Sequence, residues 1–272
     1  MTALVVRRLL VDMEQPIPRH WCAGDAFRTA LFNALSFSFP FGEQFFIDSV
    51  RDGFAKLPPE VQEKLRDDVQ GFVGQEATHR RLHGLYNAQL EKNGLVNVWE
   101  PRSRERFKAL EGVDVRHWLG ITAANEHLTA ILADFMLHNP DLLGEQDERL
   151  KTLWLWHSAE ESEHKSVAYD VYQTLDGDYG WRIKWMKRAT FLFVSESLRQ
   201  TVVNLKRDGT LWKWSTWRSA ASYLFGKRGM VRLVYGPWKE YLRRDFHPAQ
   251  VGSEAARKWL AENGDVFVPV GT

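Results

Sequence analysis

The sequence predicts an all-α protein in which a four-helix bundle is followed by additional C-terminal helices. Clusters of proline, glycine and asparagine divide the 272 residues into pieces of helical length. No piece shows sustained alternation of apolar and polar residues, apart from a possible short strand near Leu4–Val11. Four pieces carry glutamate and histidine side chains on otherwise apolar helical faces. These three observations indicate helices packed around a polar centre.

The bundle helices are predicted at Asp25–Phe54, Pro59–Lys92, Val115–His138 and Glu148–Tyr172. The first is strongly aromatic and contains Pro40, which predicts a kink or a restart of the helix three residues before Glu43. The third has alanines on the face that carries Glu126. Such small residues would leave space for a substrate beside that carboxylate.

Further helices are predicted after residue 181, at Arg182–Lys206, Thr216–Val234, Pro237–Asp245 and Ser253–Asn263. We expect residues 1–180 to form the bundle and residues 181–272 to form a helical extension packed on it, within one continuous domain. The chain as a whole has a net charge of +1, yet residues 181–245 hold 15 lysines and arginines against four acidic residues. The same segment holds six of the 12 tryptophans.

This basic, aromatic segment has three interpretations. A helical cap that forms ion pairs with the acidic remainder of the chain is favoured, because charge patterning alone is weak evidence of a partner. Peripheral contact of residues 181–245 with an anionic membrane surface is the second interpretation. Nucleic acid is disfavoured because no recognition motif accompanies the charge. The sequence leaves open whether the extension forms a lid, a homodimer interface or a membrane contact.

A pattern of carboxylates and histidines occurs twice in the predicted bundle. In each half a lone glutamate is followed 33 or 35 residues later by Glu-x-x-His, and the halves are offset by 83 to 85 residues. The residues are Glu43, Glu76 and His79 in the first half and Glu126, Glu161 and His164 in the second. Ferritin-like four-helix bundles hold two metal ions with this set of side chains. Incidental surface charge is disfavoured, because charges on apolar faces need partners.

His157 breaks the symmetry between the halves. It shares a helical face with Glu161 and His164, whereas its counterpart 85 residues earlier is Phe72. His157 is therefore either a third histidine ligand or a residue that orients a ligand through a hydrogen bond.

Other polar residues near the pattern are expected to play supporting parts. His83, one turn after His79, is predicted to support the ligands or to line a tunnel rather than to bind metal directly. Glu160 and Glu163 flank Glu161 on other helical faces, and they are expected to be solvated or to support the ligands from behind.

The ligand types limit the metal and the compartment. Cys22 is the only cysteine, so any metal must use histidine and carboxylate ligands, which favours iron or manganese and leaves zinc open. The absence of His-Glu-x-x-His argues against a metallopeptidase. No apolar signal core and no stretch of about 18 apolar residues is present. We therefore expect a cytoplasmic protein that is at most peripheral to the membrane.

At these residues the chain resembles the ferritin-like di-iron carboxylate superfamily over roughly residues 25–172. Nearly the whole chain also resembles a bacterial family catalogued as predicted metal-dependent hydrolases. The segments that carry this likeness are Leu35–Glu43, Glu76-Ala-Thr-His79, Asn125-Glu126-His127, Glu161-Ser-Glu-His164 and Asp245-Phe246-His247-Pro248.

The spacing of His157, Glu161 and His164 is similar to the three-histidine di-iron site of arylamine N-oxygenases. In that family an extra histidine on a bundle helix binds one iron, and Glu76 and Glu161 would correspond to bridging ligands. The resemblance implies seven metal ligands, Glu43, Glu76, His79, Glu126, His157, Glu161 and His164. The likeness does not extend beyond the site, so the amine substrate does not carry over.

Together these features predict a non-haem di-iron oxygenase or oxidase. Two iron ions would activate dioxygen to oxidise a small organic substrate, with electrons from a separate donor. A di-metal hydrolase using a metal-bound hydroxide is the alternative. A non-enzymatic iron-binding or membrane-associated protein is a second alternative. The sequence does not identify the substrate, the electron donor or the oligomeric state.

Overall fold

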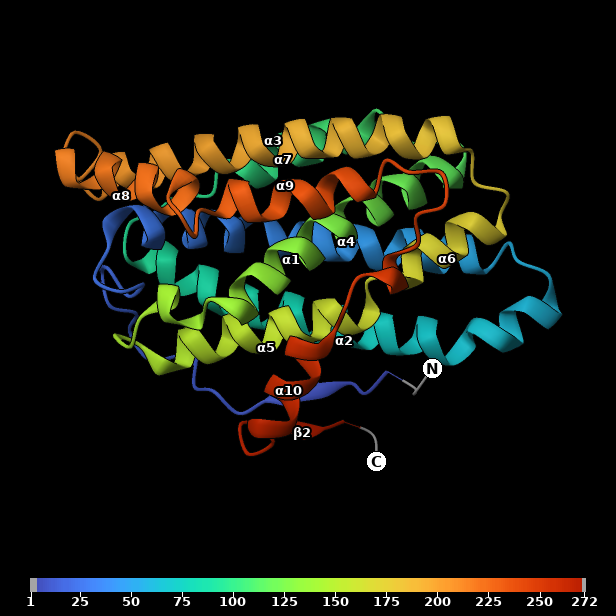
Figure 1. Cartoon of the computed structure of the whole chain (residues 1–272), viewed down its shortest axis with the longest axis horizontal. Coiled ribbons are helices and arrows are strands. Elements are labelled where there is room, and N and C mark those ends of the chain that lie inside the picture. The colour runs from blue at the N-terminus through green and yellow to red at the C-terminus, as the bar shows by residue number, and fades with distance from the viewer. Residues whose placement is uncertain (1–3, 271–272) are drawn as a thin grey trace.

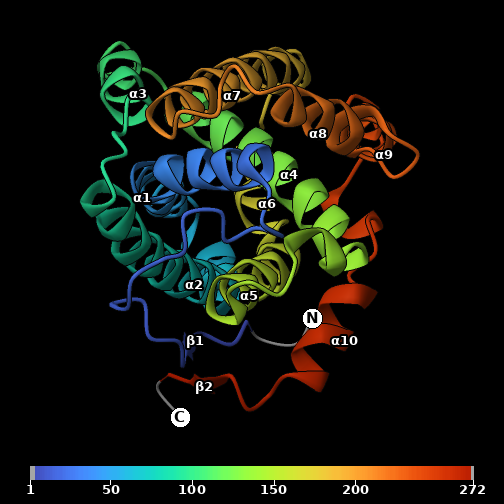
Figure 2. The same ribbon diagram turned by 90° about the vertical axis from the view of Figure 1, so that its left-hand side faces the viewer.

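The computed structural model describes residues 4–270 and is built around four long helices that run side by side (Figure 1). These are α1 (Ala26–Phe54), α2 (Pro59–Lys92), α4 (Val115–His138) and α5 (Glu148–His164). Figure 2 looks along the bundle and shows them arranged around a common centre. The predicted all-α class and ferritin-like four-helix bundle with additional C-terminal helices are thus confirmed.

Helix α1 runs through Pro40 without the predicted restart. Proline lacks the N–H that would bond the carbonyl four residues earlier, which here is the carbonyl of Ser36. That carbonyl accepts a hydrogen bond from the Asn87 Nδ2 amide of α2 at 2.9 Å. The next carbonyl, of Phe37, accepts one from Asn97 Nδ2 at 3.0 Å. The Asn87 side chain therefore replaces the helical bond that is lost at Pro40, and the helix continues past Glu43 to Phe54.

The bounds of α2 and α4 match the prediction, but the fourth predicted helix is divided. Helix α5 ends at His164, and the short helix α6 (Val167–Thr174) follows after a turn. Lys165 lies in this turn, and its ammonium group donates to the Val251 carbonyl at 2.7 Å. Helix α3 (Trp99–Lys108) was not predicted, and it lies outside the bundle against α1 and α7.

The C-terminal helices lie on the bundle but differ from the prediction beyond α7. They are α7 (Tyr179–Arg207), α8 (Trp214–Phe225), α9 (Met230–Glu240) and α10 (Glu254–Glu262), with 3₁₀ turns at Pro140–Leu143 and Pro248–Gln250. The predicted helix Thr216–Val234 is broken between α8 and α9, where Gly229 N bonds to the Gly226 carbonyl in a turn. Pro237 lies inside α9 rather than at a helix start.

Helix α7 crosses the outside of α1 and α4 (Figure 2). Arg182, near its start, is buried and donates to the carbonyls of Tyr241 and Arg243 at 2.8 and 2.6 Å. These bonds fasten the segment that follows α9 to the start of α7. Within residues 4–270, no helix has both the length and the apolar character required to span a bilayer.

A two-stranded sheet lies beneath α2 and α5. Strand β1 (Arg7–Leu9), within the predicted strand region, pairs antiparallel with β2 (Phe267–Pro269), so that Arg8 lies opposite Val268. The segment before β1 packs on α2 at Gly71 and Gly74. A Cβ atom at Gly71 would lie 2.4 Å from the Cβ atom of Leu4. Glycine is therefore required there for the N-terminal segment to approach the helix.

Two glycines of α2 should respond oppositely to alanine. Gly71→Ala is expected to lower the free energy of unfolding by about 1–3 kcal/mol, because its methyl group overlaps Leu4. Gly84 has no atom within 4 Å of its would-be Cβ, so Gly84→Ala should raise that free energy by about 0.5–1 kcal/mol. Urea unfolding followed by circular dichroism measures both, and equal stabilisation by the two variants would contradict the close approach.

Candidate metal centre

The structure brings the doubled carboxylate and histidine pattern together in the middle of the bundle. Glu43 comes from α1, Glu76 and His79 from α2, and Glu126 from α4. Helix α5 supplies the remaining three residues, His157, Glu161 and His164. All seven predicted ligands, together with His83, are buried, and none is more than 4% exposed.

Five of the six residues of the repeated pattern form two groups that share Glu76. Ligand atoms of Glu43, Glu76 and His79 lie within 4.8 Å of one another, as do those of Glu76, Glu161 and His164. Glu161 Oε1 lies 3.5 Å from both His79 Nδ1 and His164 Nε2. Glu76 also lies between the two histidines, 4.0 Å from His79 and 3.4 Å from His164. Glu76 and Glu161 therefore each lie close to both histidines.

The lone glutamates lie at the two outer ends of this arrangement. Glu126 Oε2 is 3.4 Å from His164 Nε2, and Glu43 belongs to the group of His79. Each end thus combines one lone glutamate and one histidine with the two shared carboxylates. This is the donor set of a di-metal carboxylate centre.

The donor atoms fit a bound metal because they have no other partner. Nine buried oxygen and nitrogen atoms of these residues make no hydrogen bond within the described part of the chain. They are both carboxylate oxygens of Glu43, Glu76 and Glu126, together with Glu161 Oε2, His79 Nδ1 and His164 Nε2. Buried polar groups without partners are costly, and so many in one place indicate a cation. Oxygen and imidazole donors without sulfur suit iron, manganese or zinc.

The carboxylates strongly perturb one another's protonation. Burial raises the pKa of Glu43 and of Glu126 well above the usual range, and the neighbouring carboxylates Glu76 and Glu161 raise these values further. Burial would also raise the pKa of Glu161, but His164 and the hydrogen bond from His157 hold it well below its usual range. Glu161 is thus the carboxylate most strongly held in its charged form.

The ring of each histidine of the repeated pattern is hydrogen-bonded by the residue that precedes Glu76 or Glu161. His79 Nε2 bonds to Glu160 Oε2 at 3.0 Å, and His164 Nδ1 bonds to Gln75 Oε1 at 2.9 Å. Burial would lower the pKa of His79, but its bonds to Glu160 and Glu161 raise it to about 10. Such outer hydrogen bonds fix the ring orientation of a metal ligand.

Arg7 completes this support from the N-terminal strand. Its guanidinium group donates to Glu160 Oε1 at 3.1 Å and to Glu163 Oε2 at 2.6 Å. Gln75 Nε2 donates to the same Glu163 oxygen at 3.0 Å. Neither Gln75 nor Arg7 was identified from the sequence. Gln75 and Glu160 occupy equivalent positions in the two halves, 85 residues apart, so an alignment of the halves could have revealed the pair.

His157 lies beside the centre, but both of its ring nitrogens have partners. Nε2 is 3.0 Å from Glu161 Oε1, and Nδ1 is 2.8 Å from His83 Nε2. His83 Nδ1 in turn lies 2.9 Å from Ser36 Oγ. Burial and the charge on His79 lower the pKa of His157 to about 4, so its ring is neutral at neutral pH. His157 is thus placed to orient Glu161, and a ligand role would require it to exchange one of these bonds.

The predicted asymmetry between the halves is visible in the packing. The ring of His157 stacks on His79 with 4.1 Å between centroids. At the other end, the ring of Phe72 contacts His164 edge-on at 5.0 Å. A polar ring therefore covers one end of the centre and an apolar ring covers the other.

An aromatic cavity approaches the centre from the side of α7. It has a volume of about 360 Å³, and most of its wall is apolar, including Phe41, Phe46, Trp99, Phe107, Ile121 and Trp185. A small hollow of about 20 Å³ adjoins this cavity. Phe39, Thr129 and Phe193 line both spaces, and the hollow also reaches Glu161 and His157. An apolar molecule in the cavity would therefore lie one layer of side chains from the centre.

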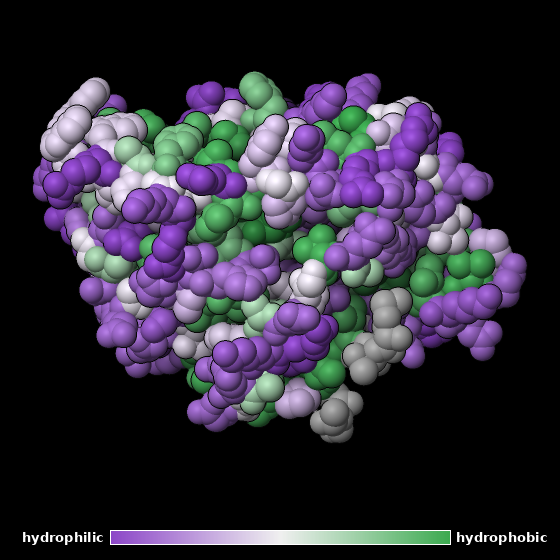
Figure 3. Space-filling view, in the orientation of Figure 1, coloured by the Kyte–Doolittle hydropathy of each residue, from purple (hydrophilic) through white to green (hydrophobic). Residues whose placement is uncertain are grey.

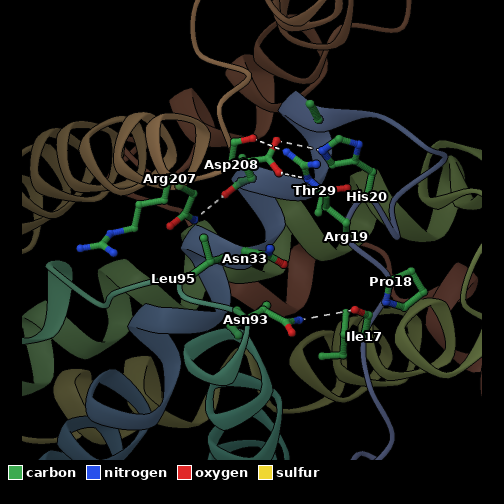
Figure 4. Close-up of a pocket in the computed structure, with 14 residues that line it drawn as sticks. Ile17, Pro18, Arg19, His20, Thr29, Asn33, Asn93, Leu95, Arg207 and Asp208 are labelled. Atoms are coloured by element: carbon green, nitrogen blue, oxygen red, sulfur yellow. Dashed lines mark hydrogen bonds and ion pairs between the residues drawn. The ribbon is translucent and has the colours of Figure 1, made fainter.

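A second pocket, of about 390 Å³, lies away from the predicted ligands (Figure 4). Its wall is mainly polar, and Asp208 is already held there by His20 Nε2 at 2.9 Å and Arg19 Nε at 2.5 Å. None of the seven predicted ligands lines it.

Comparisons with known proteins give one match. The comparison with curated proteins and the comparison with solved structures found none. A family model described as a predicted metal-dependent hydrolase matches residues 5–252, which include the whole bundle and all seven predicted ligands. The chain therefore belongs to the family of predicted metal-dependent hydrolases.

Proposed function

We propose that the protein is a non-haem di-iron oxygenase or oxidase that acts on an apolar organic molecule. The proposal is supported by nine buried donor atoms without partners beside an aromatic cavity. Glu43, Glu76, His79, Glu126, Glu161 and His164 would hold the two metal ions. When bound, two ferrous ions would supply electrons for the reduction of dioxygen, and an external donor would replace them.

The remaining residues would orient the ligands and exclude water. Glu160 and Gln75 hold the two histidine rings, and His157 holds Glu161. The aromatic wall of the cavity would bind an apolar substrate and keep bulk water from the centre. Phe39, Thr129 and Phe193 separate the cavity from the hollow beside Glu161, so their side chains would control the approach of substrate.

Metal-dependent hydrolysis is the second candidate, and the description of the family favours it. A hydrolase would use the same metal ligands to activate water. The chemical character of the cavity distinguishes the candidates, because polar esters and phosphates require polar groups for recognition. In this cavity Arg106 is paired with Glu196 at 2.8 Å, and the wall near the centre is mostly aromatic. We therefore place oxidation of an apolar substrate first.

Metal analysis tests the centre itself. The purified protein is expected to hold about two iron ions per chain. Glu161→Ala removes a bridging carboxylate and should reduce this content to about one ion or fewer. Glu63→Ala, which changes an exposed residue on α2, is the matched control and should retain the full content. Elemental analysis measures both, and an unchanged metal content in Glu161→Ala would exclude it as a ligand.

The hydrogen bond behind His79 can be tested separately. Glu160→Gln keeps the shape of the side chain but removes the negative charge of the carboxylate that both Arg7 and His79 contact. Metal affinity is expected to fall about 10- to 100-fold, as for other outer-shell changes. Competition with a chelator measures the affinity, with the exposed substitution Glu148→Gln on the same helix as control. Equal affinity in the two variants would show that Glu160 does not support the ligand.

Reactivity decides between the two functions. Protein loaded with ferrous iron is expected to consume dioxygen in proportion to its iron, and Glu76→Ala should abolish this uptake. Zinc-loaded protein is expected not to hydrolyse nitrophenyl esters or phosphates. An oxygen electrode and absorbance spectroscopy measure the two activities. Hydrolysis by the zinc form together with no oxygen uptake by the iron form would replace oxidation with hydrolysis.

A further inference from the structure

The outer side of α7 carries an apolar stripe that nothing covers in the described structure. Phe191, Val194, Leu198 and Val202 are spaced three or four residues apart and therefore share one helical face. All four are exposed, and Phe191 is 70% exposed. The stripe is flanked by basic residues that are also exposed, namely Lys184, Lys187, Arg188, Arg199 and Lys206.

Large apolar side chains are also exposed on α8, on α9 and in the turn that precedes α8. Trp212 is 90% exposed and Trp214 is 78% exposed, and Phe225, Leu233 and Tyr235 are also exposed. Helix α9 lies beside α7, to which it is tied by a 2.8 Å hydrogen bond from Trp238 Nε1 to Thr190 Oγ1. Figure 3 shows hydrophobic and hydrophilic side chains interspersed along the upper part of the molecule, where these helices lie. We call the outer surface of α7, α8 and α9, residues 181–245, the basic aromatic face.

The positive charge of the basic aromatic face is not neutralised by the rest of the chain. Of the 15 lysines and arginines of residues 181–245, 12 form no ion pair within residues 4–270. Arg228 alone pairs with an acidic residue outside the segment, Asp141. Two of the four acidic residues of the segment, Glu196 and Asp208, are paired with arginines from elsewhere. The interpretation of this segment as a cap whose basic residues pair with the acidic remainder of the chain is therefore supported by one ion pair only in the described part of the chain, Arg228 with Asp141.

We propose that the basic aromatic face binds the surface of an anionic lipid bilayer. Helices that lie in a membrane interface combine an apolar stripe with flanking lysine and arginine, and exposed tryptophan is typical of that interface. A second copy of the chain is a poorer partner, because a symmetric dimer would place two positively charged surfaces against each other. Nucleic acid would satisfy the charge but would leave Phe191, Val194, Leu198 and Val202 facing water. A bilayer satisfies both features.

The position of the aromatic cavity links this surface to the centre. Trp185, Arg188, Ala189, Leu192 and Phe193 of α7 all line the cavity, and Arg188 also flanks the exposed stripe. A molecule dissolved in the bilayer would thus enter the cavity beside α7 without crossing water. This link to the substrate rests on the proposed function, whereas binding to the bilayer does not depend on it.

Vesicle sedimentation tests the proposal with the full-length protein. Binding is expected to phosphatidylcholine vesicles that contain phosphatidylglycerol, more weakly to phosphatidylcholine alone, and less at high salt. Lys184→Glu with Lys187→Glu should weaken binding at least about tenfold, because each basic side chain at an anionic surface contributes about fivefold. Lys64→Glu with Lys92→Glu makes the same charge change on α2 and should bind nearly as well as the unchanged protein.

The apolar contribution needs its own variant. Trp212→Ser with Trp214→Ser removes two exposed rings without touching the core and should also weaken binding to the mixed vesicles. Circular dichroism confirms that each variant is folded, and none of these readouts requires bound metal. The proposal is overturned if the mixed vesicles are not bound, or if the α2 control weakens binding as much as the α7 variant. It is also overturned if the protein alone is a dimer that Lys184→Glu with Lys187→Glu dissociates.

Discussion

Four carboxylates in the middle of an apolar helical bundle impose the main physical constraint on this protein. Glu43, Glu76, Glu126 and Glu161 are removed from water and lie close together, so both desolvation and mutual repulsion oppose their charged forms. Two metal ions would compensate this charge and give the free donor atoms partners. Packing of α1, α2, α4 and α5 and the binding of metal are therefore thermodynamically coupled.

The two ends of the centre have the same arrangement of residues, but the residues that surround them differ in charge and polarity. A charged carboxylate, Glu160, supports His79, whereas a neutral amide, Gln75, supports His164. His157 covers the first end and Phe72 covers the second. The first end therefore has the more polar surroundings. Two metal ions held here would differ in electron density, which suits a reaction in which they play different parts.

The sequence predicted the elements whose signals are local. The bounds of α2 and α4 and the convergence of the ligand pattern follow from helical spacing, which depends only on near neighbours along the chain. The uninterrupted α1 could not be foreseen, because Asn87, which replaces the bond lost at Pro40, lies on another helix. The support of His79 by Arg7 was hidden for the same reason. The break between α8 and α9 was foreseeable from Gly226 and Gly229.

The short sheet that joins the two ends of the chain sets the order in which the centre is completed. Arg7, which holds Glu160 behind His79, lies in a strand whose partner is Phe267–Pro269. The ring of Phe267 also covers the Arg7 guanidinium at 5.4 Å. During synthesis the bundle helices leave the ribosome long before this partner strand does. The contact of Arg7 with Glu160 therefore gains its covering strand only after all the bundle helices have been made, so the last support of the candidate site forms after the helices themselves.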